Sequence, residues 1–95
     1  MKTRIDIDDL RMTSKKDIHA YLKEVFNFPE YYGKNLDALY DSLCEIDEDK
    51  EIVFTDKSLR NICDNEYAYK VLMVFGKAAM DNPHLHIQFR RSEDD

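Results

Sequence analysis

The sequence predicts an α/β fold, in which about four helices cover a three-stranded parallel sheet within one small domain of residues 1–95. Short apolar runs of strand length occur near the start, in the middle and near the end of the chain, and segments of helical periodicity separate them. Strands that alternate with helices favour right-handed crossovers and therefore parallel pairing. A chain of 95 residues suffices for one core, with roughly 60 to 65% of its surface buried on folding.

The first predicted elements are a strand and a helix. Residues 4–8 alternate apolar and polar side chains, as a half-buried strand does. Ser14 is a preferred N-cap residue and Asp17 follows three positions later, which predicts the start of a helix. Pro29 favours an extended conformation of the residue before it, so this helix should end near Phe26 or Asn27. Its apolar stripe consists of Ile18, Leu22, Val25 and Phe26.

A second helix is predicted after a loop that contains glycine. Gly33 allows a turn with a positive φ, and Asn35 is a preferred N-cap residue. At about 100° per residue, one stripe of this helix is apolar and faces the core: Leu36, Leu39, Leu43 and Ile46. Another stripe, roughly a third of a turn away, is polar or aromatic: Asp37, Tyr40, Asp41 and Cys44. The second stripe can therefore face a partner.

The rest of the chain continues the alternation. Residues 51–55 are a short apolar run, typical of a central strand buried on both faces. Residues 57–61 predict a short helix, and apolar spacings of three and four over residues 65–81 predict a long one. A final strand sets an apolar inner row against a polar row: Leu85, Ile87 and Phe89 against His84, His86 and Gln88. Residues 92–95 are expected to form a frayed polar tail.

The segment from Phe28 to Leu43 carries more polar and aromatic side chains than folding requires. Asp37 falls in the first turn of the predicted helix, near the positive end of the helix dipole, so folding alone can explain it. Asp41 repeats the charge one turn later, which costs a few tenths of a kcal/mol in an isolated helix. Tyr31 and Tyr40 add contact area while their hydroxyls stay in water. This combination suits a cationic pocket on another molecule.

Two ordered runs in this segment resemble the signature of the barstar family, the intracellular inhibitors of microbial guanyl-preferring ribonucleases such as barnase. The runs are Pro29-Glu30-Tyr31-Tyr32-Gly33 and Asn35-Leu36-Asp37-Ala38-Leu39-Tyr40-Asp41. Weaker similarity extends over nearly the whole chain. The resemblance implies a barstar-like α/β arrangement, with its strand count and order. It also implies a protein that is not an enzyme and that needs no cofactor.

The resemblance further implies an inhibitor that plugs a ribonuclease active site in a 1:1 complex. Asp41 would occupy the place of a substrate phosphate and meet the enzyme's arginines and catalytic histidine. Tyr31 is expected to point outward and Tyr32 inward. The expected partner-binding residues are Tyr31, Gly33, Asn35, Leu36, Asp37, Tyr40, Asp41 and Cys44. The expected partner is a microbial extracellular ribonuclease or a ribonuclease toxin domain.

Four positions depart from the family prototype. Tyr40 and Ile46 stand where it has tryptophan, and Cys44 stands where it has threonine. Lys77 aligns with a glutamate that faces the basic enzyme, and a lysine there would repel a cationic cleft. Either the partner differs around that spot or Lys77 points elsewhere. These departures motivate an alternative function, a dedicated immunity protein against a secreted or contact-delivered toxin that need not resemble barnase.

Composition narrows the remaining classes. The formal net charge of −6 disfavours direct contact with nucleic acid phosphates. It suits a mimic of phosphate charge, although acidic surfaces also keep many cytosolic proteins soluble. The absence of a long apolar run and of a signal-peptide core predicts a cytoplasmic protein without membrane contact. Cys44 and Cys63 lack metal-site spacing and are expected to be ordinary thiols.

Three other groups of residues contain side chains that can take part in catalysis or metal binding. His84 and His86 are spaced for chelation, but no third ligand is fixed nearby in the sequence, so a solvated polar row is the favoured interpretation. His19 is expected at the surface or rim of its helix. Asp37 and Asp41 could be an acid and base pair, but a glycosidase needs a deep sugar cleft and a longer chain. A small hydrolase or metal-binding protein is therefore the weakest alternative, and zinc titration would test it.

Overall fold

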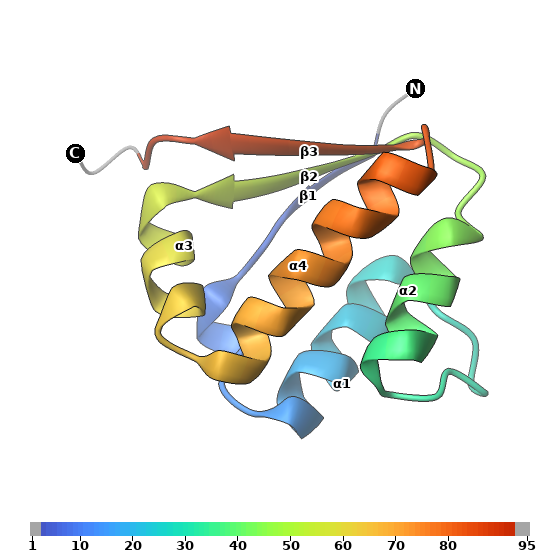
Figure 1. The fold of residues 1–95 in the computed structure, drawn as a ribbon, viewed down its shortest axis with the longest axis horizontal. Coiled ribbons are helices and arrows are strands. Elements are labelled where there is room, and N and C mark those ends of the chain that lie inside the picture. Colours follow the sequence, from blue (N-terminus) through green and yellow to red (C-terminus); the bar gives the residue numbers. More distant parts are fainter. Residues whose placement is uncertain (1–2, 93–95) are drawn as a thin grey trace.

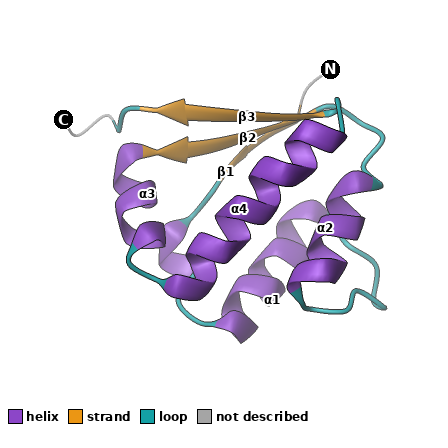
Figure 2. Ribbon diagram, in the orientation of Figure 1, coloured by secondary structure: helices purple, strands orange, loops and turns teal. Residues whose placement is uncertain are grey.

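The structure, a computed structural model, describes residues 3–92 and confirms the predicted α/β fold. Figure 1 shows its helices gathered on one side of a sheet, with strands and helices distinguished in Figure 2. The strands are β1 (Thr3–Asp6), β2 (Lys50–Thr55) and β3 (Leu85–Arg90). The helices are α1 (Lys15–Phe26), α2 (Leu36–Cys44), α3 (Asp56–Cys63) and α4 (Glu66–Asp81), with a short 3₁₀ helix at Asp9–Arg11.

The sheet is parallel throughout and has the strand order β1-β2-β3. The register aligns Ile5, Ile52 and Ile87 across the three strands. Strand β2 is central, and Ile52, Val53 and Phe54 are all buried, as the continuous apolar run predicts. Ile52 and Phe54 belong to the main core, whereas Val53 points to the opposite face of the sheet.

Local sequence signals set the helix ends where predicted. The Ser14 side chain accepts a hydrogen bond from the Asp17 N–H (3.2 Å) at the start of α1. The same helix ends at Phe26, because Asn27 adopts a left-handed conformation (φ 56°) and starts the turn into Pro29. Helix α4 begins after Asn65, whose side chain accepts from the Ala68 N–H (3.1 Å).

Helix α4 is the centre of the helical layer. It runs between α2 and α3 in Figure 1 and packs against both. Its buried residues repeat at the predicted spacing and include Val71, Phe75 and Ala78. The Phe75 ring meets Phe54 of the central strand edge-on, with 6.0 Å between ring centroids. The position of α2 is thus fixed by a helix that is itself packed on the sheet.

The end of β3 differs from the prediction. Phe89 was expected in the buried row, but 64% of its surface is exposed. Ile87 is only half-buried, and Leu85 alone of the three is buried. The reason is that an open groove, lined by Ile87 and Phe89, lies between α4 and this part of the edge strand and leaves the apolar row partly uncovered. Strand alternation correctly predicts a shared face but not how far the helices reach.

Of the expected polar tail the structure describes only Ser92, whose N–H donates to Asp56 Oδ1 (2.7 Å). Residues 93–95 of the expected tail lie outside the described residues. Cys44 and Cys63 are both free cysteines. Within residues 3–92, no helix combines the length and apolar character needed to cross a membrane.

Candidate functional site

The exposed side of α2 carries two carboxylates in the described structure. Asp37 and Asp41 lie one helical turn apart and both are exposed. Neither side chain has a hydrogen bond or an ion pair with any of residues 3–92. Within this part of the chain, no hydrogen bond or ion pair therefore offsets their mutual repulsion. We call the surface formed by Asp37, Tyr40, Asp41 and Tyr31 the acidic face.

The loop before α2 is fastened to the start of the helix by Asn35. Its Oδ1 accepts a hydrogen bond from the Ala38 N–H (2.8 Å), which confirms the predicted N-cap. Its Nδ2 donates to the Gly33 carbonyl (3.3 Å). One side chain therefore joins the loop backbone to the first turn of α2.

The predicted positive φ at Gly33 is wrong. No glycine in the described residues has a positive φ, and the left-handed residue of this loop is Lys34 (φ 55°). Gly33 is needed for a different reason: a Cβ placed on it would lie 3.0 Å from the Ala38 Cβ. The loop backbone passes so close to α2 that only glycine fits without displacement.

The two adjacent tyrosines of the loop point in opposite directions, as expected. Tyr31 is 85% exposed, whereas Tyr32 is buried. The Tyr32 ring packs on Phe28, with 4.9 Å between centroids, and its N–H donates to the Pro29 carbonyl (3.0 Å). Burial of Tyr32 therefore holds the turn that presents Tyr31 to solvent.

His19 is buried under this loop, contrary to the expectation of a rim position. Only 1% of its surface is exposed. Its Nδ1 lies 2.6 Å from the Tyr32 hydroxyl and its Nε2 lies 2.6 Å from the Tyr67 hydroxyl. Two tyrosines distant in sequence thus satisfy both ring nitrogens, a pairing that no local pattern indicates. Burial, and secondarily the charge of Lys15, holds the pKa of His19 below its ordinary value of 6.5.

The free energy of unfolding should decrease on acidification because of His19. Its pKa is lower in the folded than in the unfolded chain, so below about pH 6.5 the unfolded chain binds more protons. Stability is therefore fully present above pH 6.5 and is lost as the pH falls toward the folded-state pKa. Urea unfolding at pH 7.5, 6.5 and 5.5 measures this trend. In His19→Gln the dependence over this range should become shallower, and an unchanged slope would contradict the assignment.

The Tyr40 side chain is clamped between α2 and α4. Its hydroxyl donates to the Asp81 carboxylate, and the Lys77 Nζ lies 5.0 Å from the centre of its ring. Hydrogen bonding to Asp81 and then to Cys44 raises the pKa of the Tyr40 hydroxyl. The ring is therefore held in one place at the edge of the acidic face.

Lys77 lies beside the acidic face and does not point away from it. It helps to line an open hollow of about 360 Å³ between α2 and α4. The lining residues are Leu36, Asp37, Tyr40, Met73, Val74 and Lys77. A partner that binds the two aspartates would therefore meet a positive charge next to them.

The far end of α2 is held by Asn82, a buried residue at the C-terminal end of α4. Its Nδ2 lies within hydrogen-bond distance of the carbonyl oxygens of Leu43 (2.9 Å), Cys44 (3.4 Å) and Ile46 (3.0 Å). Its Oδ1 accepts from the His84 N–H (2.9 Å). Carbonyl groups at a helix end need such external donors.

The predicted site residues fall into three groups. Tyr31, Asp37 and Asp41 are exposed, and Tyr40 and Leu36 are half-buried beside them. Gly33 and Asn35 form the junction that positions the loop. Cys44 is half-buried at the end of α2, and its interaction with the Tyr40 hydroxyl helps to raise the pKa of that hydroxyl. Sequence reasoning missed the wall supplied by α4, which includes Met73, Val74 and Asp81, because only the packing of α2 on α4 brings it here.

The paired histidines lie at the start of β3 and are not part of the acidic face. His84 Nδ1 lies 3.0 Å and His86 Nε2 lies 3.7 Å from the same oxygen of Asp49. The hydrogen bond from His84 lowers the pKa of the Asp49 carboxyl group. Among residues 3–92 there is no group of three or more His, Cys, Asp or Glu side chains arranged to hold a metal ion.

Comparison with known proteins agrees with this geometry. The family model described as Barstar (barnase inhibitor) matches residues 3–91. A protein of Bacillus subtilis (strain 168), named "Putative ribonuclease inhibitor YrdF", is 36% identical over 76 residues. The aligned region covers 79% of this chain and 84% of that protein. The family match includes the loop, α2 and the wall formed by α4.

Proposed function

Because this chain belongs to the barstar family of ribonuclease inhibitors, we propose that it inhibits a microbial ribonuclease by covering the enzyme's active site with its acidic face. The observation that carries the proposal is the pair of exposed carboxylates of Asp37 and Asp41, which have no partner among residues 3–92, on a helix fixed at both ends. A ribonuclease cleft is built to hold phosphates, and two carboxylates one helical turn apart can occupy phosphate positions. Asp41 is the central anion and Asp37 lies beside it.

The chain acts in this proposal by stoichiometric binding and not by catalysis. One copy covers one enzyme in the cytoplasm, and no cofactor takes part. Tyr31, Asn35, Leu36 and Tyr40 shape the contact, with the backbone at Gly33 and the end of α2 at Cys44 completing it. The net charge of −6 accelerates the encounter with a cationic enzyme and makes the association rate sensitive to salt.

Rigidity of the acidic face supports tight binding. Tyr32 is anchored in the core, Asn35 ties the loop to α2, and Asn82 holds the opposite helix end. Tyr40 is clamped by Asp81 and Lys77. A surface that is already ordered loses little conformational entropy on binding, so more of the contact energy appears as affinity.

A second candidate function is supported by the place of Lys77. Its charge stands next to the carboxylates, in the hollow that Asp37 also lines. A partner complementary to this surface offers cations to the aspartates and an anion or an apolar group to Lys77. A dedicated immunity protein for one toxin would meet such a partner. Purification of a tagged chain from its native host should then recover one toxin domain and leave generic guanyl-preferring ribonucleases behind.

Titration of barnase with the purified chain tests the first proposal. Ribonuclease activity should fall linearly and reach its minimum at one equivalent of inhibitor, because binding is tight and 1:1. Association should slow between 50 and 500 mM NaCl, since salt screens the steering charges. A chain that leaves barnase fully active at tenfold excess, and that recovers no ribonuclease from its host, would contradict the proposal.

A further inference from the structure

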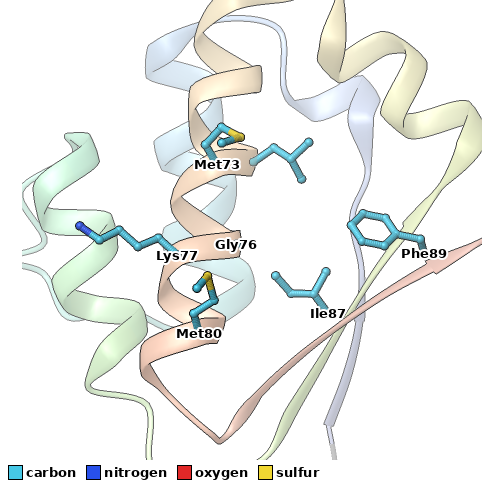
Figure 3. Close-up of a pocket in the computed structure, with 7 residues that line it drawn as sticks. Met73, Gly76, Lys77, Met80, Ile87 and Phe89 are labelled. Atoms are coloured by element: carbon cyan, nitrogen blue, oxygen red, sulfur yellow. The ribbon is translucent and has the colours of Figure 1, made fainter.

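An open apolar groove of about 430 Å³ lies between α4 and β3. Seven residues line it and are drawn in Figure 3: Leu72, Met73, Gly76, Lys77, Met80, Ile87 and Phe89. Met73, Met80 and Phe89 are 57%, 87% and 64% exposed, although all three are large and apolar. Adjacent exposed residues of this kind mark interaction surfaces more often than scattered ones do.

The apolar groove adjoins the acidic face. Met73 and Lys77 line both this groove and the hollow that contains Asp37 and Tyr40. Figure 3 shows the Lys77 side chain extending from α4 toward α2, on the side of α4 away from Ile87 and Phe89. The acidic face and the apolar groove therefore lie on opposite sides of α4.

The size of the groove limits the kinds of molecule that can bind in it. Seven residues line it, whereas a stable protein interface uses roughly 20 to 30 residues on each side. The groove alone is thus too small to hold two copies of this chain together. Its only charged side chain, Lys77, turns toward Tyr40, and a small-molecule site needs several convergent polar groups. The groove is, however, large enough to form the outer part of a larger protein–protein interface.

We infer that the apolar groove receives an apolar side chain of the same ribonuclease whose active site the acidic face covers. This inference rests on the proposed function and extends it, because it describes the partner's surface beyond its catalytic cleft. The partner carries cations that meet Asp37 and Asp41, and next to them an exposed apolar side chain that enters between Met73, Met80 and Phe89. Ribonucleases with a charged residue at that place are bound less tightly, since its burial in the groove would cost desolvation energy.

Gly76 offers a direct way to close the groove. It lies on α4 among the lining residues, and a Cβ built on it would meet no atom within 4 Å. A larger side chain here projects into the groove without displacing the core. Glycine within a helix also destabilises it relative to alanine or leucine, so substitution should raise the melting temperature.

The test compares Gly76→Leu with Gly76→Ala as its matched control, using barnase as the probe. Gly76→Leu should weaken binding about tenfold or more, while Gly76→Ala, which leaves most of the groove open, should change it less than about threefold. Neither variant should melt below the unaltered chain. Phe89→Ala, which removes one wall at an exposed position, should also weaken binding, and its loss should not add fully to that of Gly76→Leu.

The outcomes separate this inference from the proposed function. Unchanged or tighter barnase binding by Gly76→Leu, while Asp41→Ala still weakens it strongly, overturns the inference and leaves the proposed function intact. Concentration-dependent dimers of the unaltered chain that Gly76→Leu abolishes, seen by sedimentation, overturn it in favour of a second copy as occupant. An unaltered chain that neither binds barnase nor recovers a ribonuclease from its host overturns both, and a ribonuclease recovered from the host replaces barnase as the probe.

Discussion

Asp41→Ala is expected to weaken ribonuclease binding by about two to four orders of magnitude. Removing one partner of a buried charge pair costs roughly 3–5 kcal/mol, because the other charge stays desolvated without compensation. In the proposed complex the uncompensated charges are cations of the enzyme cleft. The Asp41 side chain makes no hydrogen bond or ion pair within residues 3–92, so its removal should cost the folded chain no such interaction. Relief of the repulsion by Asp37 should even stabilise it by a few tenths of a kcal/mol.

Asp64→Ala provides the matched control for this measurement. Asp64 is also an exposed carboxylate at the end of a helix, but α3 lies on the opposite side of α4 from α2 (Figure 1). Its loss removes the same formal charge and should change the dissociation constant by less than about threefold. Isothermal titration calorimetry with barnase measures both variants. Equal effects of the two substitutions would show that net charge, and not the place of Asp41, governs binding.

Asn82→Ala is expected to lower the free energy of unfolding by roughly 2–4 kcal/mol. The substitution removes the donor that serves the carbonyls of Leu43, Cys44 and Ile46 and the acceptor for the His84 N–H. Buried polar groups left without partners cost roughly 1–3 kcal/mol each, and partial access of water reduces the total. Urea unfolding followed by circular dichroism measures the loss.

Asn61→Ala is the control for this variant. Asn61 is exposed, and its Nδ2 donates to the carboxylate of the half-buried Asp9 (2.5 Å). Asn61→Ala should therefore change the free energy of unfolding by no more than about 0.5 kcal/mol. Faster hydrogen exchange should appear in the last turn of α2 in Asn82→Ala and not in Asn61→Ala. A loss below about 1 kcal/mol in Asn82→Ala would mean that Asn82 does not fasten α2.

The features of the fold that depend on residues close together in the sequence were predictable. Ser14 and Asn35 cap their helices as expected, because an N-cap interaction spans only three residues. The apolar run of residues 51–55 is buried on both faces, since its pattern reflects its position in the middle of the sheet. The face that Phe89 shares with Leu85 was predicted correctly, but its exposure depends on how far α4 extends over β3.

The exposure of Tyr31, Asp37 and Asp41 was predictable from the sequence, whereas their surroundings were not. The resemblance of the loop and α2 to a known family identified Asp41 and Tyr31, and the structure places both at the surface. Tyr40 meets Asp81, which lies 41 residues away, and His19 meets Tyr67, which lies 48 residues away. Such pairs depend on tertiary packing, which leaves no mark on local periodicity. For the same reason the sequence does not predict the direction of Lys77, which depends on the packing of α4 against α2.

The dependence of α2 on Asn82 also determines when the acidic face can form during synthesis. Helix α2 is fully synthesised at Cys44, but its last carbonyl groups have no hydrogen-bond donor until Asn82 has been added. Strand β2 lacks its partner β3 until synthesis reaches Arg90. The ribosome must add 46 residues between Cys44 and Arg90, which takes roughly 2 to 9 s at 5 to 20 residues per second. During that interval the nascent chain has its carboxylates but not the support that orders them. If the chain inhibits a ribonuclease as proposed, only finished chains can bind the enzyme, so a reserve of folded protein must exist before the ribonuclease appears.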